Sequence, residues 1–153
     1  MTKWCESGKD IYPVLKNRPC WIGVDLSKKI DLTSVAAVFP LDDGCFAVLH
    51  HSFMPEESIN EKERIDKCPY SAWVRDGYIT AIPGETINQD WIEDYIKTLS
   101  LKYDIQEICY DPWNASQFAQ NMDAEGFICV EVRQGHKSLS EPTKSIEKLV
   151  YDK

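Results

Sequence analysis

Two aspartates stand at the ends of apolar segments whose hydrophobic residues alternate with the period of a β-strand. Asp25 lies near the end of the segment 21–27, and Asp111 ends the segment 105–111. A carboxylate beside an apolar strand is costly unless it is paired or bound to a cation. A sheet that sets both strand ends side by side would create an oxygen-ligand site for Mg²⁺ or Mn²⁺. The residues also allow a second interpretation, in which each aspartate only caps the turn after its strand.

Such a pair of carboxylates is suited to hydrolysis. A carboxylate that bridges two cations about 4 Å apart lets one ion activate a water while the other stabilises the leaving oxygen. Asp31 follows Asp25 by six residues, in a predicted turn. Asp31 is either a group that orients a ligand or a metal-bound water, or a plain turn residue.

The remaining polar residues define the other possible sites. His50 and His51 are adjacent, so in a strand they point to opposite faces and cannot both reach one ion. Arg133 and Lys137 either contact phosphate oxygens or lie in a solvated loop. Gly8-Lys9 lacks the rest of a phosphate-binding loop, and the chain has no G-x-S-x-G nucleophile elbow.

The elements that must position these residues begin with strands. A turn over 40–44 joins strand-like segments 33–39 and 45–50, so with 21–27 they predict an antiparallel three-stranded meander. Further along, strand and helix patterns alternate. Residues 56–76 are predicted to be helical with a break near Pro69, and strands are predicted over 77–84, 105–111 and 127–132. A helix between the first two of these strands would place inward Trp91, Ile92, Tyr95, Ile96 and Leu99, and one between the last two would place inward Ala115, Phe118, Ala119 and Met122. A last helix is predicted from Pro142, with Ile146, Leu149 and Val150 inward.

This order predicts an α/β fold, in which a mixed central sheet of a meander followed by β-α-β units is flanked by helices. With 153 residues, 43% of them hydrophobic, the chain can form one domain with a real core. The longest apolar run has five residues, and the first 20 lack the apolar stretch of a secretory signal. We therefore expect a soluble, intracellular protein with no membrane partner.

The net charge is −8, from 17 basic and 25 acidic residues, which argues against a general nucleic-acid binder. The charge is uneven, because residues 133–148 hold four bases and two acids. An acidic protein can still act on DNA if its carboxylates hold metal ions and a local basic patch binds the strand.

Four blocks of the sequence resemble one family in its order. They are residues 21–33, 81–84, 108–115 and 132–140, and the third contains Tyr-Asp-Pro-Trp. They resemble the nuclease domain of the large terminase subunit of tailed bacteriophages, and the resemblance covers residues 19–150. It implies a ribonuclease H-like fold that uses two divalent ions, Mg²⁺ or Mn²⁺, to cut concatemeric double-stranded DNA during genome packaging in the cytoplasm of the bacterial host.

The resemblance also implies roles for individual residues. Asp25 matches the first metal-binding acid of the family and Asp111 the second, so both would be catalytic. Asp31 matches an acid beside the site. Arg133, Gln134 and Lys137 match a loop near the active site that would face DNA.

Two departures from the family pattern qualify these expectations. Large terminases carry an ATPase domain before the nuclease, and no Walker A pattern occurs here, so residues 1–20 are expected to connect the two domains and 21–153 to form an incomplete nuclease domain. The family's third acid lies in a later helix that this chain does not reach, so we expect weak metal binding and poor activity of this chain alone.

Two alternatives remain from the sequence. The first is a catalytically incomplete module that docks to the portal, the small terminase subunit or DNA. The second is an actin-like or sugar-kinase-like nucleotide binder, which would need a glycine-rich phosphate loop where Ser27-Lys28-Lys29 stands.

Overall fold

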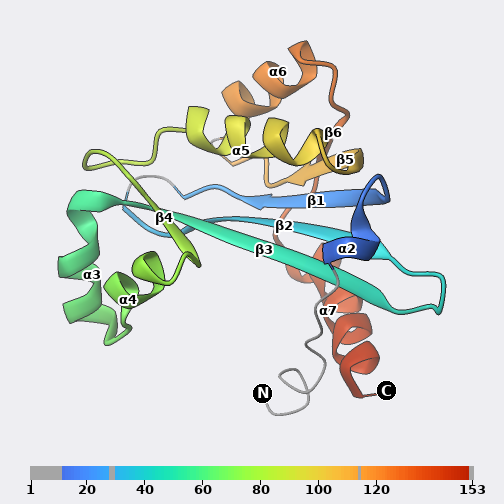
Figure 1. Ribbon diagram of the computed structural model, residues 1–153, viewed down its shortest axis with the longest axis horizontal. Helices are drawn as coiled ribbons and strands as arrows, with labels where there is room; N and C mark the ends of the chain where they lie inside the picture. Colours follow the sequence, from blue (N-terminus) through green and yellow to red (C-terminus); the bar gives the residue numbers. More distant parts are fainter. Residues whose placement is uncertain (1–11, 28–29, 114, 152–153) are drawn as a thin grey trace.

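The computed structural model describes residues 12–27, 30–113 and 115–151, which form a mixed sheet flanked by helices (Figure 1). The strands are β1 (Pro19–Asp25), β2 (Thr33–Pro40), β3 (Phe46–Pro55), β4 (Ile79–Ile82), β5 (Asp104–Tyr110) and β6 (Cys129–Glu131). Helical segments are α2 (Tyr12–Leu15), η1 (Glu56–Ser58), α3 (Ile59–Asp66), α4 (Tyr70–Arg75), α5 (Asp90–Ser100), α6 (Ser116–Ala124) and α7 (His136–Tyr151).

The six strands lie in the order β4-β3-β2-β1-β5-β6. β1, β2 and β3 form the antiparallel meander that the sequence predicts. β5 pairs in parallel with β1, and β6 with β5. Parallel strands end at the same edge of a sheet, so the carboxyl ends of β1 and β5 are neighbours, and the predicted α/β fold class is confirmed.

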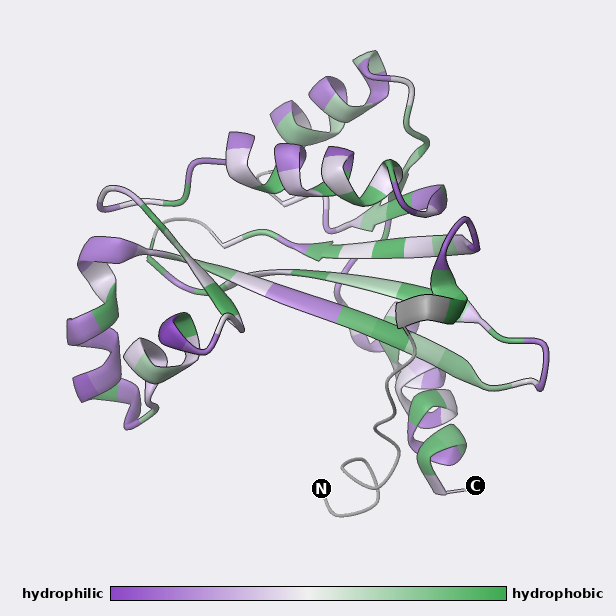
Figure 2. Ribbon diagram, in the orientation of Figure 1, coloured by the Kyte–Doolittle hydropathy of each residue, from purple (hydrophilic) through white to green (hydrophobic). Residues whose placement is uncertain are grey.

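One face of the sheet carries the core. Alternate residues of β1 point toward α5 and α6, so that Cys20, Ile22 and Val24 are buried. Figure 2 shows hydrophobic colours along much of the strands, apart from a hydrophilic stretch in the middle of β3, and hydrophilic colours on α5 and α6 on the side away from the sheet. Phe118 and Met122 of α6 are fully buried, as predicted. Leu15 of α2 is also fully buried, so part of the predicted connecting segment packs into this core.

A smaller cluster packs under α3 and α4 at the β4 edge of the sheet. Met54, Ile59, Tyr70 and Ile79 form its buried centre. The helical region 56–76 divides as expected near Pro69, because α3 ends at Asp66 and the residue that caps it, Lys67, is in a left-handed conformation. This cluster fixes the end of β3 beside β4.

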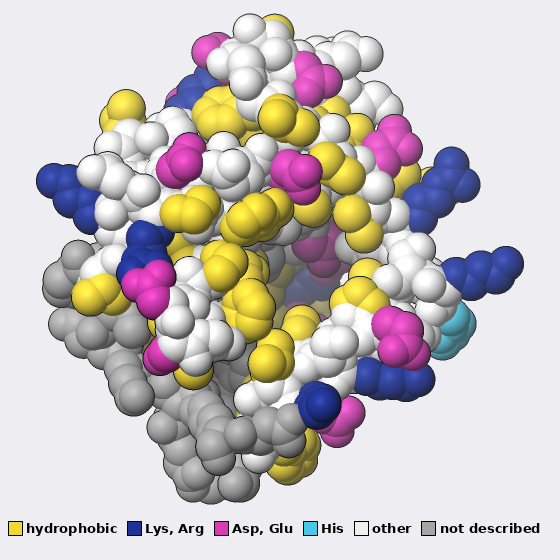
Figure 3. All heavy atoms as spheres, turned by 90° about the vertical axis from the view of Figure 1, so that its right-hand side faces the viewer, with side chains coloured by type: hydrophobic (Ala, Val, Ile, Leu, Met, Phe, Trp, Pro, Cys, Tyr) yellow, Lys and Arg dark blue, Asp and Glu magenta, His cyan; other side chains and the backbone are white. Residues whose placement is uncertain are grey.

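The opposite face of the sheet is largely open. Trp21, Val38 and Val48 are cross-strand neighbours on it, and Trp21 and Val48 are 38% and 42% exposed. Figure 3, viewed from the side of the β2–β3 hairpin, shows hydrophobic side chains around a hollow. In the described part of the chain, no helix is long and apolar enough to cross a membrane.

Two helix predictions are wrong in detail. α7 begins at His136 rather than at Pro142, and it buries none of its residues, so Ile146 and Leu149 are about half exposed rather than inward. α5 begins at Asp90, which leaves Trp91 in its first turn with 43% of its surface exposed. Amphipathic spacing identifies a helix and its apolar face, but it does not determine whether a neighbouring element covers that face.

Candidate functional site

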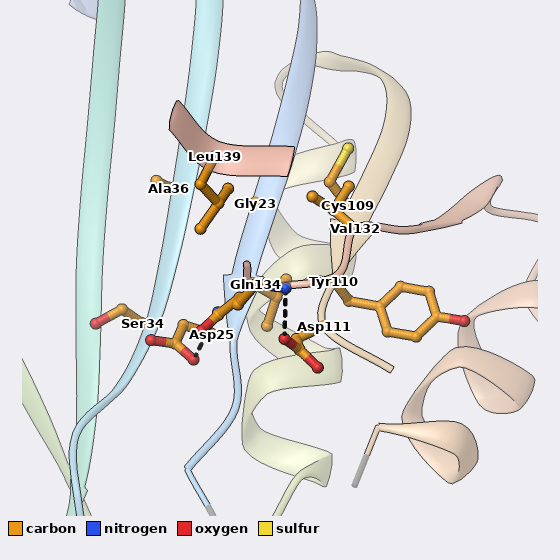
Figure 4. Close-up of a pocket in the computed structure, with 11 residues that line it drawn as sticks. Gly23, Asp25, Ser34, Ala36, Cys109, Tyr110, Asp111, Val132, Gln134 and Leu139 are labelled. Atoms are coloured by element: carbon orange, nitrogen blue, oxygen red, sulfur yellow. Dashed lines mark hydrogen bonds between the residues drawn. The ribbon is translucent and has the colours of Figure 1, made fainter. Parts of the chain in front are cut away.

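The register between β1 and β5 brings the two aspartates together. Val24 pairs with Tyr110, so Asp25 at the end of β1 lies beside Asp111, the residue after β5. Both line a cavity of about 290 Å³ and a second, adjoining one of about 630 Å³. Figure 4 shows the two carboxylates at one end of the first cavity, from neighbouring strands.

The Asp111 carboxylate is held in place by the backbone. Its Oδ1 accepts a hydrogen bond of 2.8 Å from the backbone N–H of Trp113, and its Oδ2 accepts one of 3.0 Å from the backbone N–H of Gln134. The first bond is the turn cap that the sequence left open as an alternative. The second ties the segment after β6 to the end of β5. Each oxygen keeps a further lone pair, so these bonds orient the carboxylate without using up its capacity as a ligand.

Gln134 links the two aspartates. Its side-chain Nε2 donates a long hydrogen bond of 3.5 Å to Asp25 Oδ1, while its backbone bonds Asp111 (Figure 4). Gln134 reaches this place because β6 pairs with β5 and the backbone N–H of Val132 donates to Tyr110 O. Gln134 lines both cavities and Arg133 lines the second.

The other predicted site residues lie outside this group. Asp31 is not among the described residues that line either cavity, and its carboxylate accepts a hydrogen bond from Lys62 of α3, which raises the pKa of Lys62. Lys137 is exposed in the first turn of α7 and is likewise absent from both described linings. The structure therefore gathers Asp25, Asp111, Gln134 and Arg133.

The sequence did not single out two residues of the first cavity. Ser34 of β2 is the register partner of Asp25, and Cys109 of β5 is the partner of Gly23. Burial raises the pKa of the Cys109 thiol, with the nearby Glu107 adding to the effect, so this thiol is protonated at neutral pH and is a poor nucleophile. The alternating pattern of residues 33–39 indicates which face of the strand Ser34 lies on, but only the strand register places Ser34 beside Asp25.

The possible ligand atoms at this site are of the chemical type that a hard divalent cation binds. Asp25, Asp111 and the Gln134 amide offer only oxygen atoms as ligands, which is the preference of Mg²⁺ and Mn²⁺, and waters fill the remaining positions of such sites. No group of three or more metal-ligating His, Cys, Asp or Glu side chains occurs within the described residues. The arrangement thus has two acidic ligands.

Comparison with known proteins identifies first the fold and then the family of this chain. The structure of the HK97 bacteriophage large terminase resembles this chain with a TM-score of 0.86 and 27% identity, over 99% of this chain and 32% of that one. The sheet is therefore that of a ribonuclease H-like domain. A family model described as terminase large subunit, endonuclease domain, matches residues 10–153, and the chain belongs to this family.

Two curated relatives agree with this assignment. The large terminase subunit of Enterobacteria phage HK97 is 29% identical over 140 residues, which are 90% of this chain and 28% of that protein. Protein YmfN of Escherichia coli K12 is 23% identical over 152 residues, or 94% of this chain and 33% of YmfN. The chain thus spans no more than a third of the curated relatives it matches.

Proposed function

We propose that this domain is a two-metal-ion endodeoxyribonuclease that cuts concatemeric double-stranded DNA during phage genome packaging. The observation that carries the proposal is the meeting of Asp25 and Asp111 at one cavity through the β1–β5 register. Membership in the terminase endonuclease family supports the choice of DNA as substrate.

Asp25 and Asp111 would hold Mg²⁺ or Mn²⁺. When bound, such ions lower the pKa of a coordinated water and stabilise the leaving oxygen of a phosphodiester. The protein's own contribution is orientation, because Asp111 is fixed by two backbone N–H groups and Asp25 by the Gln134 amide. Arg133 and Lys137, both exposed, would bind DNA phosphates on either side of Gln134.

Family membership also supports a proposal about the rest of the assembly. We propose that residues 1–20, whose Leu15 packs into the nuclease core, lead from an ATPase domain to the nuclease domain over 21–153, and that the full-length protein works with the small terminase subunit and the capsid portal in the bacterial cytoplasm. Asp31 would act from outside the cavity, since its ion pair with Lys62 ties the segment after β1 to α3.

Titration calorimetry with Mn²⁺ tests the proposal. We expect the unmutated chain to release heat on binding Mn²⁺ and Asp25→Ala to release none, because one of the two carboxylates is lost. Asp94→Ala, at an exposed aspartate of α5, should bind Mn²⁺ like the unmutated chain, and circular dichroism should show all three folded. Titration heats of Asp25→Ala equal to those of the unmutated chain would remove the metal assignment.

A second candidate function rests on the small number of acidic side chains at the site. Because two acidic ligands come together among the described residues, the domain could instead serve as a docking module for the portal, the small subunit or DNA. Nicking of supercoiled plasmid with Mn²⁺ separates the two. A chain that neither binds Mn²⁺ nor nicks the plasmid, but binds one of these partners, is the docking module.

A further inference from the structure

A row of polar side chains crosses the open face of the sheet and ends beside Asp25. Ser34 is the register partner of Asp25 on β2, and Ser52 is the register partner of Ser34 on β3. His50 lies two residues before Ser52, so its side chain is on the same face. We call His50, Ser52 and Ser34 the relay row.

Hydrogen bonds connect the relay row from end to end. His50 Nε2 and Ser52 Oγ share one of 3.3 Å, and Ser52 Oγ and Ser34 Oγ share one of 3.0 Å. Ser52 is only 5% exposed, whereas His50 is exposed and Ser34 lines the cavity that contains Asp25. Figure 4 shows Ser34 next to Asp25, with its hydroxyl oxygen turned toward β3 and away from the Asp25 carboxylate. The row thus joins an exposed imidazole to the cavity through a buried hydroxyl.

The direction of these bonds depends on His50. A hydroxyl donates one hydrogen bond and accepts up to two. If His50 Nε2 carries a hydrogen and donates it to Ser52, the Ser52 hydroxyl is available to donate to Ser34, and the hydrogen of Ser34 can then point into the cavity. If Nε2 is bare and accepts from Ser52, the Ser52 oxygen is available to accept from Ser34, and Ser34 then presents only lone pairs to the cavity.

A DNA phosphate needs the first arrangement, because its oxygens only accept hydrogen bonds. We propose that the relay row presents the Ser34 hydroxyl as a donor to a DNA phosphate oxygen beside Asp25, and that His50 is a positioning residue that sets this polarity. The inference rests on the proposed function for the presence of DNA. His51 has no part in it, because it lies on the other face and bonds Thr80 Oγ1 at 2.8 Å.

Fluorescence anisotropy with a short fluorescein-labelled duplex, in buffer with Ca²⁺ in place of Mg²⁺, measures the effect. Ser34→Ala should weaken duplex binding about tenfold, the size expected for one hydrogen bond to a charged group. Ser34→Thr keeps the hydroxyl and should bind like the unmutated chain. His50→Ala should weaken binding and His50→Gln should restore it, because the glutamine amide can donate to Ser52.

Thr98→Ala removes an exposed hydroxyl of α5 that donates to the backbone oxygen of Asp94, and it should leave binding unchanged. Melting curves verify that each variant is folded. Unchanged affinity of Ser34→Ala, with the unmutated chain binding the duplex, would overturn the relay alone. Failure of the unmutated chain to bind any duplex would overturn DNA as the substrate, and the relay with it.

A spectroscopic measurement tests the polarity directly. Long-range ¹H–¹⁵N spectra of the imidazoles, assigned with His50→Gln, report which ring nitrogen of His50 carries the hydrogen. We expect the Nε2–H form in the unmutated chain and a change in its population in Ser52→Ala. A neutral His50 protonated at Nδ1 alone would show that the row runs the other way and that Ser34 is not a donor.

Discussion

At the scale of single residues, Asp111 shows that a carboxylate proposed as a metal ligand can also be held in place by the backbone. Its two oxygens accept hydrogen bonds from the backbone of Trp113 and of Gln134, which lie on different segments. A side chain fixed in this way loses little further freedom when it binds a ligand. The apolar strand followed by Asp-Pro made Asp111 predictable, but its bond to Gln134 depends on β6 lying beside β5.

His51 gives a prediction about pH. Burial, and then the neighbouring His50, lower the pKa of His51, which bonds Thr80 and stacks on Tyr95. Below about pH 6.5 the unfolded chain gains a proton at this position that the folded chain does not, so the free energy of unfolding falls, by at most about 1.4 kcal/mol per pH unit. Above about pH 6.5 no stability is lost through His51. Below that pH the loss of stability grows until the pH reaches the lowered pKa of the folded His51.

Urea unfolding at several pH values measures this effect. The stability of the unmutated chain should fall relative to that of His51→Gln as the pH decreases from 7.5 to 5.5, because the carboxylates titrate in both proteins and cancel. Thr98→Ala, which removes an exposed side chain that does not titrate, serves as the control and should keep the pH dependence of the unmutated chain. Parallel curves for the unmutated chain and His51→Gln would contradict the prediction.

At the scale of elements, α5 and α6 are joined by a polar contact inside their interface. Glu93 of α5 is only 6% exposed, and Asn121 of α6 donates a 2.8 Å hydrogen bond to its Oε1. Asn121→Ala should lower the free energy of unfolding by about 1–3 kcal/mol, because a buried acceptor loses its partner. Denaturant unfolding measures the change.

Gln117→Ala is the control for this contact, because Gln117 donates to Asn121 Oδ1 from an exposed position. Its cost should stay within about 0.5 kcal/mol. If Asn121→Ala were as stable as the unmutated chain, the Glu93 contact would have no part in holding the two helices together.

The elements also show what sequence reasoning could and could not provide. The meander, the later strands and the buried face of α6 followed from alternation and helical spacing, because these patterns arise from burial on one face. The start of α7 was misplaced at Pro142, since that proline lies inside the helix although it has no N–H to donate. Ser34 and Gln134 join the site through strand pairing between distant segments, which local patterns do not specify.

At the scale of the whole molecule, the extent of the folded unit can be tested at Leu15. This residue lies before β1, in the segment expected to connect domains, yet it is fully buried in the main core. Leu15→Ala should lower the free energy of unfolding by about 2–5 kcal/mol, because a buried side chain is replaced by a cavity. Val14→Ala, at a position 57% exposed, should cost less than about 0.5 kcal/mol. Equal stability of the two variants would mean that α2 is not part of the folding unit.

The pairing of β1 with β5 has a consequence for the order of events during synthesis. β2, which pairs with β1, follows it directly in the chain, whereas β5, its other partner, is synthesised only after β3, β4 and α5. On a ribosome, the first aspartate is therefore in place long before its companion exists. Under the proposed function, a growing polypeptide that stops short of residue 111 would carry only one of the two acidic ligands, and a prematurely terminated product would be unable to cut the chromosome of the cell that makes it.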